Sequence, residues 1–309
     1  MNYLNAIRYN RKSLIKYKWS PFWFGGKQLD KRLIDLIVSF QKENHLTADG
    51  LVGPSTYRRI LTFAESQDVT YKTKRTNRKK NNFLIYNNRE YEIFWPKVKL
   101  YTKKGNPKIK GKNYYSYQGK ADRGPIQFVN HWDAALSTAS CIKIINKRKL
   151  SMHFGIDNDG TIYQTMDMQD AAWQAGNELS NRIGLGVEIS NAFYLKYQEW
   201  YVKRGFGPRP IIDKLNIHGD KYVPKHLGFY DVQLEALAAL WECVSYATGM
   251  PLQVCNEKGV CNNCKRGEFS GFINHFNLTT NKIDCISLDM DRVLNKALKI
   301  RELRNEMIS

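Results

Sequence analysis

The sequence predicts an α/β protein with a central sheet, preceded by a small helical unit. Short apolar segments of strand length alternate with helical segments between residues 126 and 304, an alternation typical of α/β folds. A helical apolar stripe and a tight turn occupy residues 29–63. The chain has 309 residues, which exceeds one ordinary small domain and suggests two.

The N-terminal helical unit rests on the pattern in residues 29–63. A turn at residues 49–54 contains two glycines and a proline, and Ser55 can cap a second short helix over residues 56–63. The apolar positions at helical spacing before this turn are Leu33, Ile34, Ile37, Val38 and Phe40.

The middle of the chain is strongly basic, with sixteen Lys and Arg against three Asp and Glu in residues 70–125. Residues 67–82 are predicted to form a polar, flexible linker. Two apolar segments around Asn87-Asn88 predict a hairpin over residues 83–95. Residues 97–120 are expected to form a basic loop with interleaved tyrosines.

The rest of the chain supplies the sheet and its helices. Helices are predicted over residues 231–248, capped by Asp231 and ended by Gly249, and over residues 289–304. Residues 157–160, Asp-Asn-Asp-Gly, predict a hairpin turn. Strands are predicted over residues 126–130, 152–156, 161–166, 183–189 and 272–276.

Composition limits the class of function. A net charge of +19 attracts polyanions such as nucleic acid, anionic cell wall or membrane surfaces, without choosing among them. No apolar run reaches the roughly 18 residues that span a bilayer. The basic N-terminus lacks the pattern of a signal peptide, so we expect cytoplasmic synthesis. Because the chain lacks an export signal and has a large core, we do not expect its six cysteines to form a disulfide framework.

Residues 40–56 carry a resemblance to a known binding module. Phe40-Gln41, followed by Asp49-Gly50-Leu51-Val52-Gly53-Pro54-Ser55-Thr56, resembles the peptidoglycan-binding domain 1 family, a three-helix module. This resemblance implies that residues 1–66 bind peptidoglycan. The motif also has a structural role to play, because its glycines permit a tight turn and Thr56 can cap the next helix.

A second resemblance spans residues 83–309 and concerns the type 2 N-acetylmuramoyl-L-alanine amidases. It implies a mixed central β-sheet flanked by helices and a zinc-dependent amidase activity on peptidoglycan. The segments that carry it are 128–132 (Phe-Val-Asn-His-Trp), 151–157, 159–164, 172–176 (Ala-Trp-Gln-Ala-Gly), 183–189, and His275 followed by residues 282–285.

The resemblance implies one catalytic zinc ion held by His131, His275 and Cys285. The family uses either Asp or Cys as the third ligand, which leaves Asp284 as the alternative. The position of Lys282, two residues before Asp284, favours the aspartate. Residues 285–289 match the family's usual sequence after the ligand better if Cys285 is that ligand, and a thiolate is the softer ligand for zinc. We therefore predict Cys285.

Amide hydrolysis needs an activated water and a stabilised oxyanion, which zinc with an open position supplies. The resemblance places the catalytic glutamate at Glu188, as the general base within an apolar strand. Lys282 would hold the oxyanion. Trp173 is expected to line the substrate groove, with core packing as the alternative. Gln174 stands where the family often has His.

Three further cysteines follow the spacing Cys-x5-Cys-x2-Cys at Cys255, Cys261 and Cys264. Cys-x2-Cys is compatible with zinc. A second, structural ion would need a fourth ligand, which is not obvious, although His226 or Cys243 could serve. A loop of free thiols is the favoured prediction.

Together these features predict a phage endolysin-like enzyme that cuts the amide bond between N-acetylmuramic acid and L-alanine. We expect a monomer that reaches the wall after holin-type release and binds no nucleic acid, because no nucleic-acid motif accompanies the charge. The alternatives are a non-catalytic peptidoglycan recognition protein and a virion-associated or injected antibacterial amidase.

Overall fold

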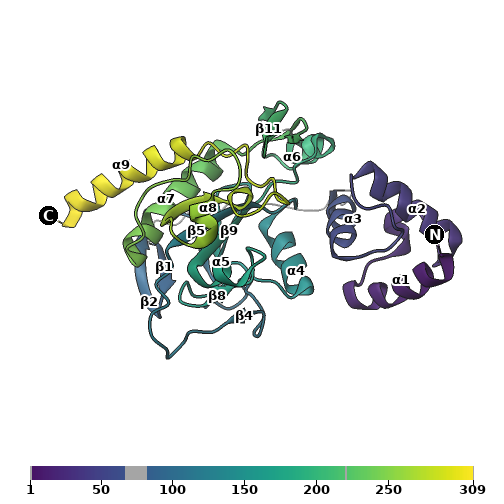
Figure 1. The fold of residues 1–309 in the computed structure, drawn as a ribbon, viewed down its shortest axis with the longest axis horizontal. Helices are drawn as coiled ribbons and strands as arrows, with labels where there is room; N and C mark the ends of the chain where they lie inside the picture. Colours follow the sequence, from purple (N-terminus) through teal and green to yellow (C-terminus); the bar gives the residue numbers. More distant parts are fainter. Residues whose placement is uncertain (1, 67–81, 220, 309) are drawn as a thin grey trace. The chain divides into compact units, whose positions relative to one another are not determined.

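The computed structural model describes residues 2–66, 82–219 and 221–308 (Figure 1). The chain divides into two compact units, Met1–Lys72 with Ala134–Leu136, and Thr73–Asp133 with Ser137–Ser309. The predicted linker at residues 67–82 lies outside the described residues except for Asn82, so the flexible linker stays a prediction. Within the described ranges, no helix is long and apolar enough to cross a membrane.

The described part of the N-terminal unit is helical. It contains α1 (Tyr3–Tyr17), η1 (Pro21–Phe24), α2 (Lys31–Glu43) and α3 (Pro54–Ser66). The apolar pattern did not predict α1, because its buried face includes the polar residues Asn10 and Ser13. The predicted start of α3 was wrong: the helix begins at Pro54, whose ring favours the first helical turn, so Ser55 lies inside the helix.

Two buried amide side chains hold the turn between α2 and α3. Asn10 donates to the carbonyl of Gly50 at 2.8 Å and accepts from the amide of Val52 at 2.8 Å. Gln41 accepts from the amide of Gly50 at 2.8 Å and donates to the Thr56 hydroxyl at 3.1 Å. The motif that suggested a binding module therefore satisfies buried backbone groups, which would be costly to leave unpaired.

The second unit is built on a mixed six-stranded sheet, which confirms the predicted α/β class. All neighbouring strands are parallel except β6 and β7, which form the hairpin predicted around residues 157–160. In order across the sheet, the strands are β14 (Gly271–Asn274), β5 (Gln127–Trp132), β9 (Gly184–Ile189), β6 (Phe154–Ile156), β7 (Ile162–Gln164) and β3 (Val98–Leu100).

Helices cover both faces of this sheet. On one face, α7 (Asp231–Thr248) and α9 (Met290–Ile308) pack against each other and share the hydrophobic core with apolar side chains of β5, β6, β9 and β14. On the other face, α4 (Thr138–Arg148) lies so close to β6 that a Cβ on Gly155 would be 2.4 Å from Thr138. The bounds of α7 agree with the prediction, but its N-cap is Tyr230, and Asp231 lies in the first turn.

The structure confirms one part of the basic segment and corrects another. β1 (Asn82–Tyr86) and β2 (Arg89–Ile93) form the predicted hairpin, with Asn87 and Asn88 at positive φ of 51° and 59°. The expectation of a loop over residues 97–120 was incomplete. This segment contributes β3 to the sheet edge, and β4 (Tyr114–Tyr115) pairs with β8 (Ala171–Ala172), because tertiary partners order strands too short to show a pattern.

Short elements complete the described unit and form its connections. They are α5 (Glu178–Ile183), η2 (Leu195–Tyr197), α6 (Gln198–Lys203), β10 (Ile211–Ile212), β11 (Leu215–Ile217), β12 (Lys221–Val223), β13 (His226–Leu227), α8 (Asn262–Arg266) and η3 (His275–Asn277).

The structure corrects the expectation that Cys255, Cys261 and Cys264 form a loop of free thiols. Cys261 and Cys264 form a disulfide, with Cα atoms 5.2 Å apart, where free thiols were predicted. The first turn of α8 brings the two residues together. Cys243 and His226 were considered as a fourth zinc ligand. Cys243 lies in α7, where its thiol donates to the carbonyl of Glu92 at 3.4 Å. His226 packs against Phe193, with ring centroids 4.9 Å apart.

A buried ion pair anchors α9, and its loss should destabilise this unit. Glu242 is 0% exposed and accepts hydrogen bonds from Arg304 at 2.7 Å and Arg301 at 2.8 Å. Glu242→Ala should lower the free energy of unfolding by about 3–5 kcal/mol, because it leaves a buried guanidinium unpaired. Urea denaturation followed by circular dichroism measures this loss.

Glu235→Ala is the matched control on the same two helices. Glu235 pairs with Lys296 at 3.1 Å near the surface, and its removal should cost at most about 1 kcal/mol. Equal losses in both variants would contradict the anchoring role of Glu242.

Candidate metal centre and active site

Parallel pairing brings three candidate residues to one edge of the sheet. His131 of β5 is in register with Glu188 of β9, and Asn130 is in register with Asn274, the residue before His275. The rings of His131 and His275 are 4.4 Å apart. Residues in register on neighbouring strands project from the same face, so Glu188 shares the face of His131.

His131, His275 and Asp284 form a buried group whose ligand atoms lie within 4.8 Å of one another. The Nδ1 atoms of the two histidines are 3.1 and 3.0 Å from the same Oδ2 of Asp284. Each histidine is only 3% exposed. Two imidazole nitrogens and a carboxylate oxygen converging on one point are a donor set that suits zinc, so these residues fit the ion that the resemblance implies.

The structure groups Asp284, and not Cys285, with the two histidines, the reverse of the sequence prediction. Cys285 is 0% exposed and packs in the hydrophobic core of the sheet. Burial, with Asp284 and Glu188 nearby, raises the pKa of its thiol well above the usual range. Adjacent side chains leave the backbone in different directions, so only one of the two residues reaches the histidines.

The charges of this group favour a cation. Burial opposes a proton on His131, but the hydrogen bond to Asp284 and the charge of Glu188 outweigh burial and raise its pKa. Burial lowers the pKa of His275. Burial would also raise the pKa of Asp284, but the two histidines hold it well below its usual range. The lowered pKa values keep the carboxyl group of Asp284 ionised and the ring of His275 neutral, which are the forms that bind metal, whereas a metal ion at His131 displaces a proton.

Gln174 orients His131, a contact that the sequence did not predict. Its Oε1 accepts a hydrogen bond from Nε2 of His131. Because Nε2 then carries the ring proton, the Nδ1 lone pair is available to a metal. A Cβ on Gly186 would lie 2.5 Å from Oε1 of Gln174, so glycine makes room for this contact. The alternation of Gly184, Gly186 and Glu188 along one strand face was the available signal.

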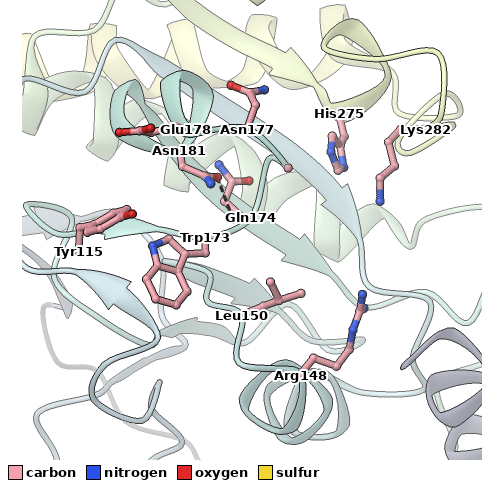
Figure 2. A pocket seen from close by; sticks show the side chains of 11 residues that line it. Tyr115, Arg148, Leu150, Trp173, Gln174, Asn177, Glu178, Asn181, His275 and Lys282 are labelled. Atoms are coloured by element: carbon pink, nitrogen blue, oxygen red, sulfur yellow. Dashed lines mark hydrogen bonds between the residues drawn. The ribbon is translucent and has the colours of Figure 1, made fainter. Parts of the chain in front are cut away.

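An open cavity of about 490 Å³ lies beside the metal group. His275 and Lys282 line one side, and Trp173 and Tyr115 line another (Figure 2). Trp173 therefore lines this cavity, and its contact with a substrate stays a prediction. Among the described residues, the cavity wall does not include Glu188, which the structure places beside His131 in the sheet.

Tyr115 is a cavity residue that sequence reasoning missed. The pairing of β4 with β8 brings it to Trp173, and the two rings make an edge contact with centroids 5.5 Å apart. Tyr115 is 51% exposed, so its ring remains available to a ligand. The interleaved tyrosines of the basic segment were the signal, but nothing local connects them to residue 173. Arg148, at the end of α4, also lines the cavity without having been predicted.

The fold and the site thus define an α/β protein with a candidate metal centre beside an open cavity. Residues 122–265 match the model of the family described as N-acetylmuramoyl-L-alanine amidase. This match includes His131 and Glu188, whereas His275 and Asp284 follow its last residue. The chain is therefore similar to this family over residues 122–265.

Several solved structures are similar to this chain. The hydrolase AmiA from Staphylococcus aureus, in complex with its ligand, has 12% identity and a TM-score of 0.40, over 68% of this chain and 84% of that chain. The endolysin LysCS from Clostridium intestinale URNW has 14% identity and a TM-score of 0.36, over 65% and 95%. AmpDh3 from Pseudomonas aeruginosa, in complex with anhydromuramic pentapeptide, has 15% identity and a TM-score of 0.38, over 61% and 65%. A search of curated proteins finds no match.

The geometry leads to a test of the third ligand. Asp284→Ala should remove one equivalent of bound zinc, because it deletes the carboxylate that both histidines face. Cys285→Ala should retain that equivalent. Metal analysis of both dialysed proteins by plasma mass spectrometry decides between the two residues. Zinc retained by Asp284→Ala and lost by Cys285→Ala would restore the sequence-based assignment.

Proposed function

We propose that this chain hydrolyses the amide bond between N-acetylmuramic acid and the L-alanine of the stem peptide in peptidoglycan. The observation that carries this proposal is the convergence of His131, His275 and Asp284 within 4.8 Å beside the cavity. The amidase match of residues 122–265 supports the substrate class. Hydrolysis of a stable amide requires the charge stabilisation that such a centre offers.

In this proposal His131, His275 and Asp284 hold one zinc ion. When bound, zinc polarises the scissile carbonyl and makes a water more acidic. The chain prepares for this ion in two ways. Gln174 fixes the ring proton of His131 on Nε2, and the two histidines keep the carboxyl group of Asp284 ionised.

Glu188 and Lys282 are the proposed catalytic residues. The Glu188 carboxylate accepts a proton from the attacking water and passes it to the leaving amide nitrogen. Its register position beside His131 supports this role. Lys282 lines the cavity with His275, and its ammonium group would offset the negative charge that develops on the carbonyl oxygen. Trp173 and Tyr115 offer an aromatic wall to the substrate.

Digestion of purified peptidoglycan tests the proposed reaction. Mass spectrometry of the products should detect new free L-alanine amino termini and no new reducing sugars. New reducing ends alone would identify a glycosidase and overturn the proposal. A protein that binds zinc and sacculi without releasing any product would instead be a recognition protein, the main alternative.

Substitution of Glu188 separates catalysis from binding. Glu188→Gln keeps the size of the side chain and removes its basic oxygen, so the turnover number should fall by about 10²–10⁴-fold. Zinc content and sacculus binding should be unchanged, because the carboxylate is not a ligand in this assignment. Turnover on soluble muropeptides, measured beside metal content, provides the test. Turnover close to that of the wild type would exclude Glu188 as the base.

We also propose that the N-terminal unit, predicted as residues 1–66, binds the wall and takes no part in bond cleavage. A chain beginning at Phe83 should cleave soluble muropeptides at the wild-type rate. Its binding to intact sacculi, measured by co-sedimentation, should be weaker. Equal sedimentation of the two chains would contradict the binding role, and loss of muropeptide cleavage would contradict the independence of the catalytic unit.

We further infer an endolysin-like role, in which the protein acts on the wall of a phage host after holin-type release. The net charge of +19 supports attraction to anionic wall polymers. A virion-associated or injected amidase would use the same site. Lysis timing in a phage that lacks the gene distinguishes these routes, because only an endolysin is required for release of progeny.

A further inference from the structure

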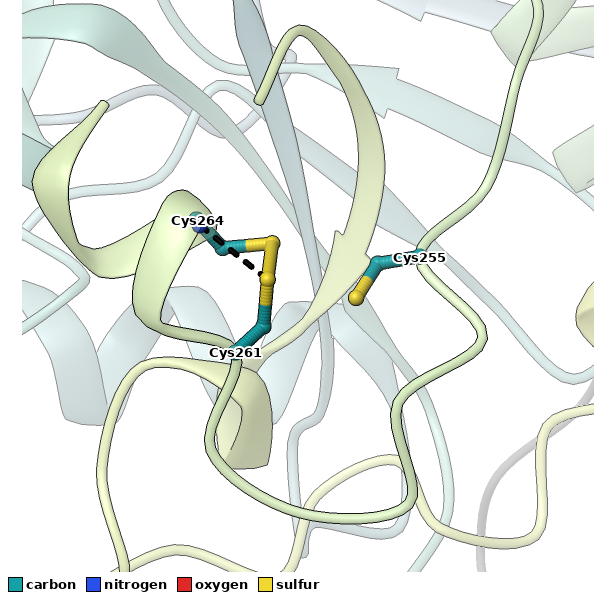
Figure 3. Close-up of side chains that lie close together, drawn as sticks. All are labelled: Cys255, Cys261 and Cys264. Carbon is teal, nitrogen blue, oxygen red and sulfur yellow. Dashed lines mark hydrogen bonds between the residues drawn. A yellow bond between two sulfur atoms is a disulfide. The ribbon is translucent and has the colours of Figure 1, made fainter. Parts of the chain in front are cut away.

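A second group of potential metal ligands lies outside the site described above. Cys255, Cys261 and Cys264 are all buried, and their Sγ atoms lie within 4.8 Å of one another (Figure 3). Cys261 is the N-cap of α8 and Cys264 lies inside that helix, whereas Cys255 comes from the preceding segment. The three sulfur atoms share an apolar cluster with Val129 and Ile273 of the sheet, among other residues.

Backbone amides are placed to stabilise negative charge on these sulfur atoms. The amide of Cys264 donates to Sγ of Cys261 at 3.1 Å. A backbone N–H hydrogen bond also runs from Glu257 to the thiol of Cys255. Amide donors of this kind favour the thiolate, the form of cysteine that binds metal.

We propose that Cys255, Cys261 and Cys264 bind a Zn²⁺ ion when all three are reduced, at a site separate from His131, His275 and Asp284. Soft thiolates select zinc among the common divalent ions. None of the described histidines or carboxylates joins the three sulfur atoms, so a water molecule takes the fourth position, as in other zinc sites with three protein ligands.

The Cys261–Cys264 disulfide is the oxidised alternative to this zinc site. Two electrons and two protons from a dithiol reductant open the disulfide to two thiols, and the reductant becomes the disulfide. Binding of Zn²⁺ then replaces the three thiol protons, which are released to solvent. The same loop is thus closed by a covalent bond in an oxidising compartment and by a metal ion in a reducing one.

The position of the loop gives the bound ion a structural role. The amide of Cys255 donates to the carbonyl of Phe272 at 3.0 Å, and the amide of Cys261 donates to that of Asn277 at 2.9 Å. Gln127 of β5 donates to the carbonyl of Cys264 at 2.8 Å. The three cysteines are therefore tied to β14, η3 and β5, the segments that carry His275 and His131.

Metal analysis of the full chain tests the proposal. Protein kept anaerobic with a phosphine reductant, incubated with Zn²⁺ and dialysed, should hold two zinc ions per chain. Cys255→Ser, Cys261→Ser and Cys264→Ser should each hold one, and Asp284→Ala should also hold one. Cys141→Ser, which changes another buried cysteine in α4, should keep two and serves as the matched control.

Cobalt substitution and alkylation provide readouts that do not depend on activity. Co²⁺-loaded wild type and Asp284→Ala should absorb in the near ultraviolet through thiolate-to-metal charge transfer, and Cys261→Ser should not. In the reduced wild type, zinc should protect the three cysteines from iodoacetamide, as peptide mass spectrometry would show. A reduced wild type with one zinc ion, no thiolate absorption and no protection overturns the proposal, whether or not the protein cleaves peptidoglycan.

Discussion

The parallel register of β14, β5 and β9 is the constraint on which the candidate site depends. Parallel strands end at the same edge of a sheet, so β5 delivers His131 and β14 delivers His275 to one point. The same register sets Glu188 of β9 beside His131. Apolar side chains on the opposite face pack against α7 and α9, and this core fixes the strands to within the tolerance that a set of metal ligands needs.

The candidate metal centre also depends on the charge of Asp284 and on the space that Gly186 leaves for Gln174. A single carboxylate faces two buried histidines, which keeps Asp284 ionised in spite of its burial. Gln174 satisfies the other ring nitrogen of His131, and it fits only because residue 186 has no side chain. A glycine and a partly buried amide thus orient one histidine, which is how contacts outside the ligand set tune metal ligands in general.

Two segments outside the family match add to the sheet and to the cavity. Val98–Leu100 extends the sheet, and Tyr114–Tyr115 adds an aromatic ring to the cavity wall. The segment from Cys255 to Cys264 lies inside the match, but its hydrogen bonds reach β14 and η3 beyond it. Val98–Leu100 forms the edge of the sheet opposite β14, away from the candidate ligands, whereas Tyr115 and the cysteine segment lie on the side of the molecule that carries them.

Local pattern in the sequence determined most of the secondary structure. The Asn87-Asn88 turn, the range of α7 and the strand through Glu188 were readable because turn chemistry and apolar periodicity are local properties. The sequence did not predict α1, whose buried face is partly polar, or the two-residue strand at Tyr114, since only their tertiary partners stabilise them. The order of the motifs also indicated the two histidines. Only the tertiary structure groups Asp284, rather than Cys285, with the two histidines, because adjacent residues have the same sequence neighbourhood, and the direction of each side chain depends on what it packs against.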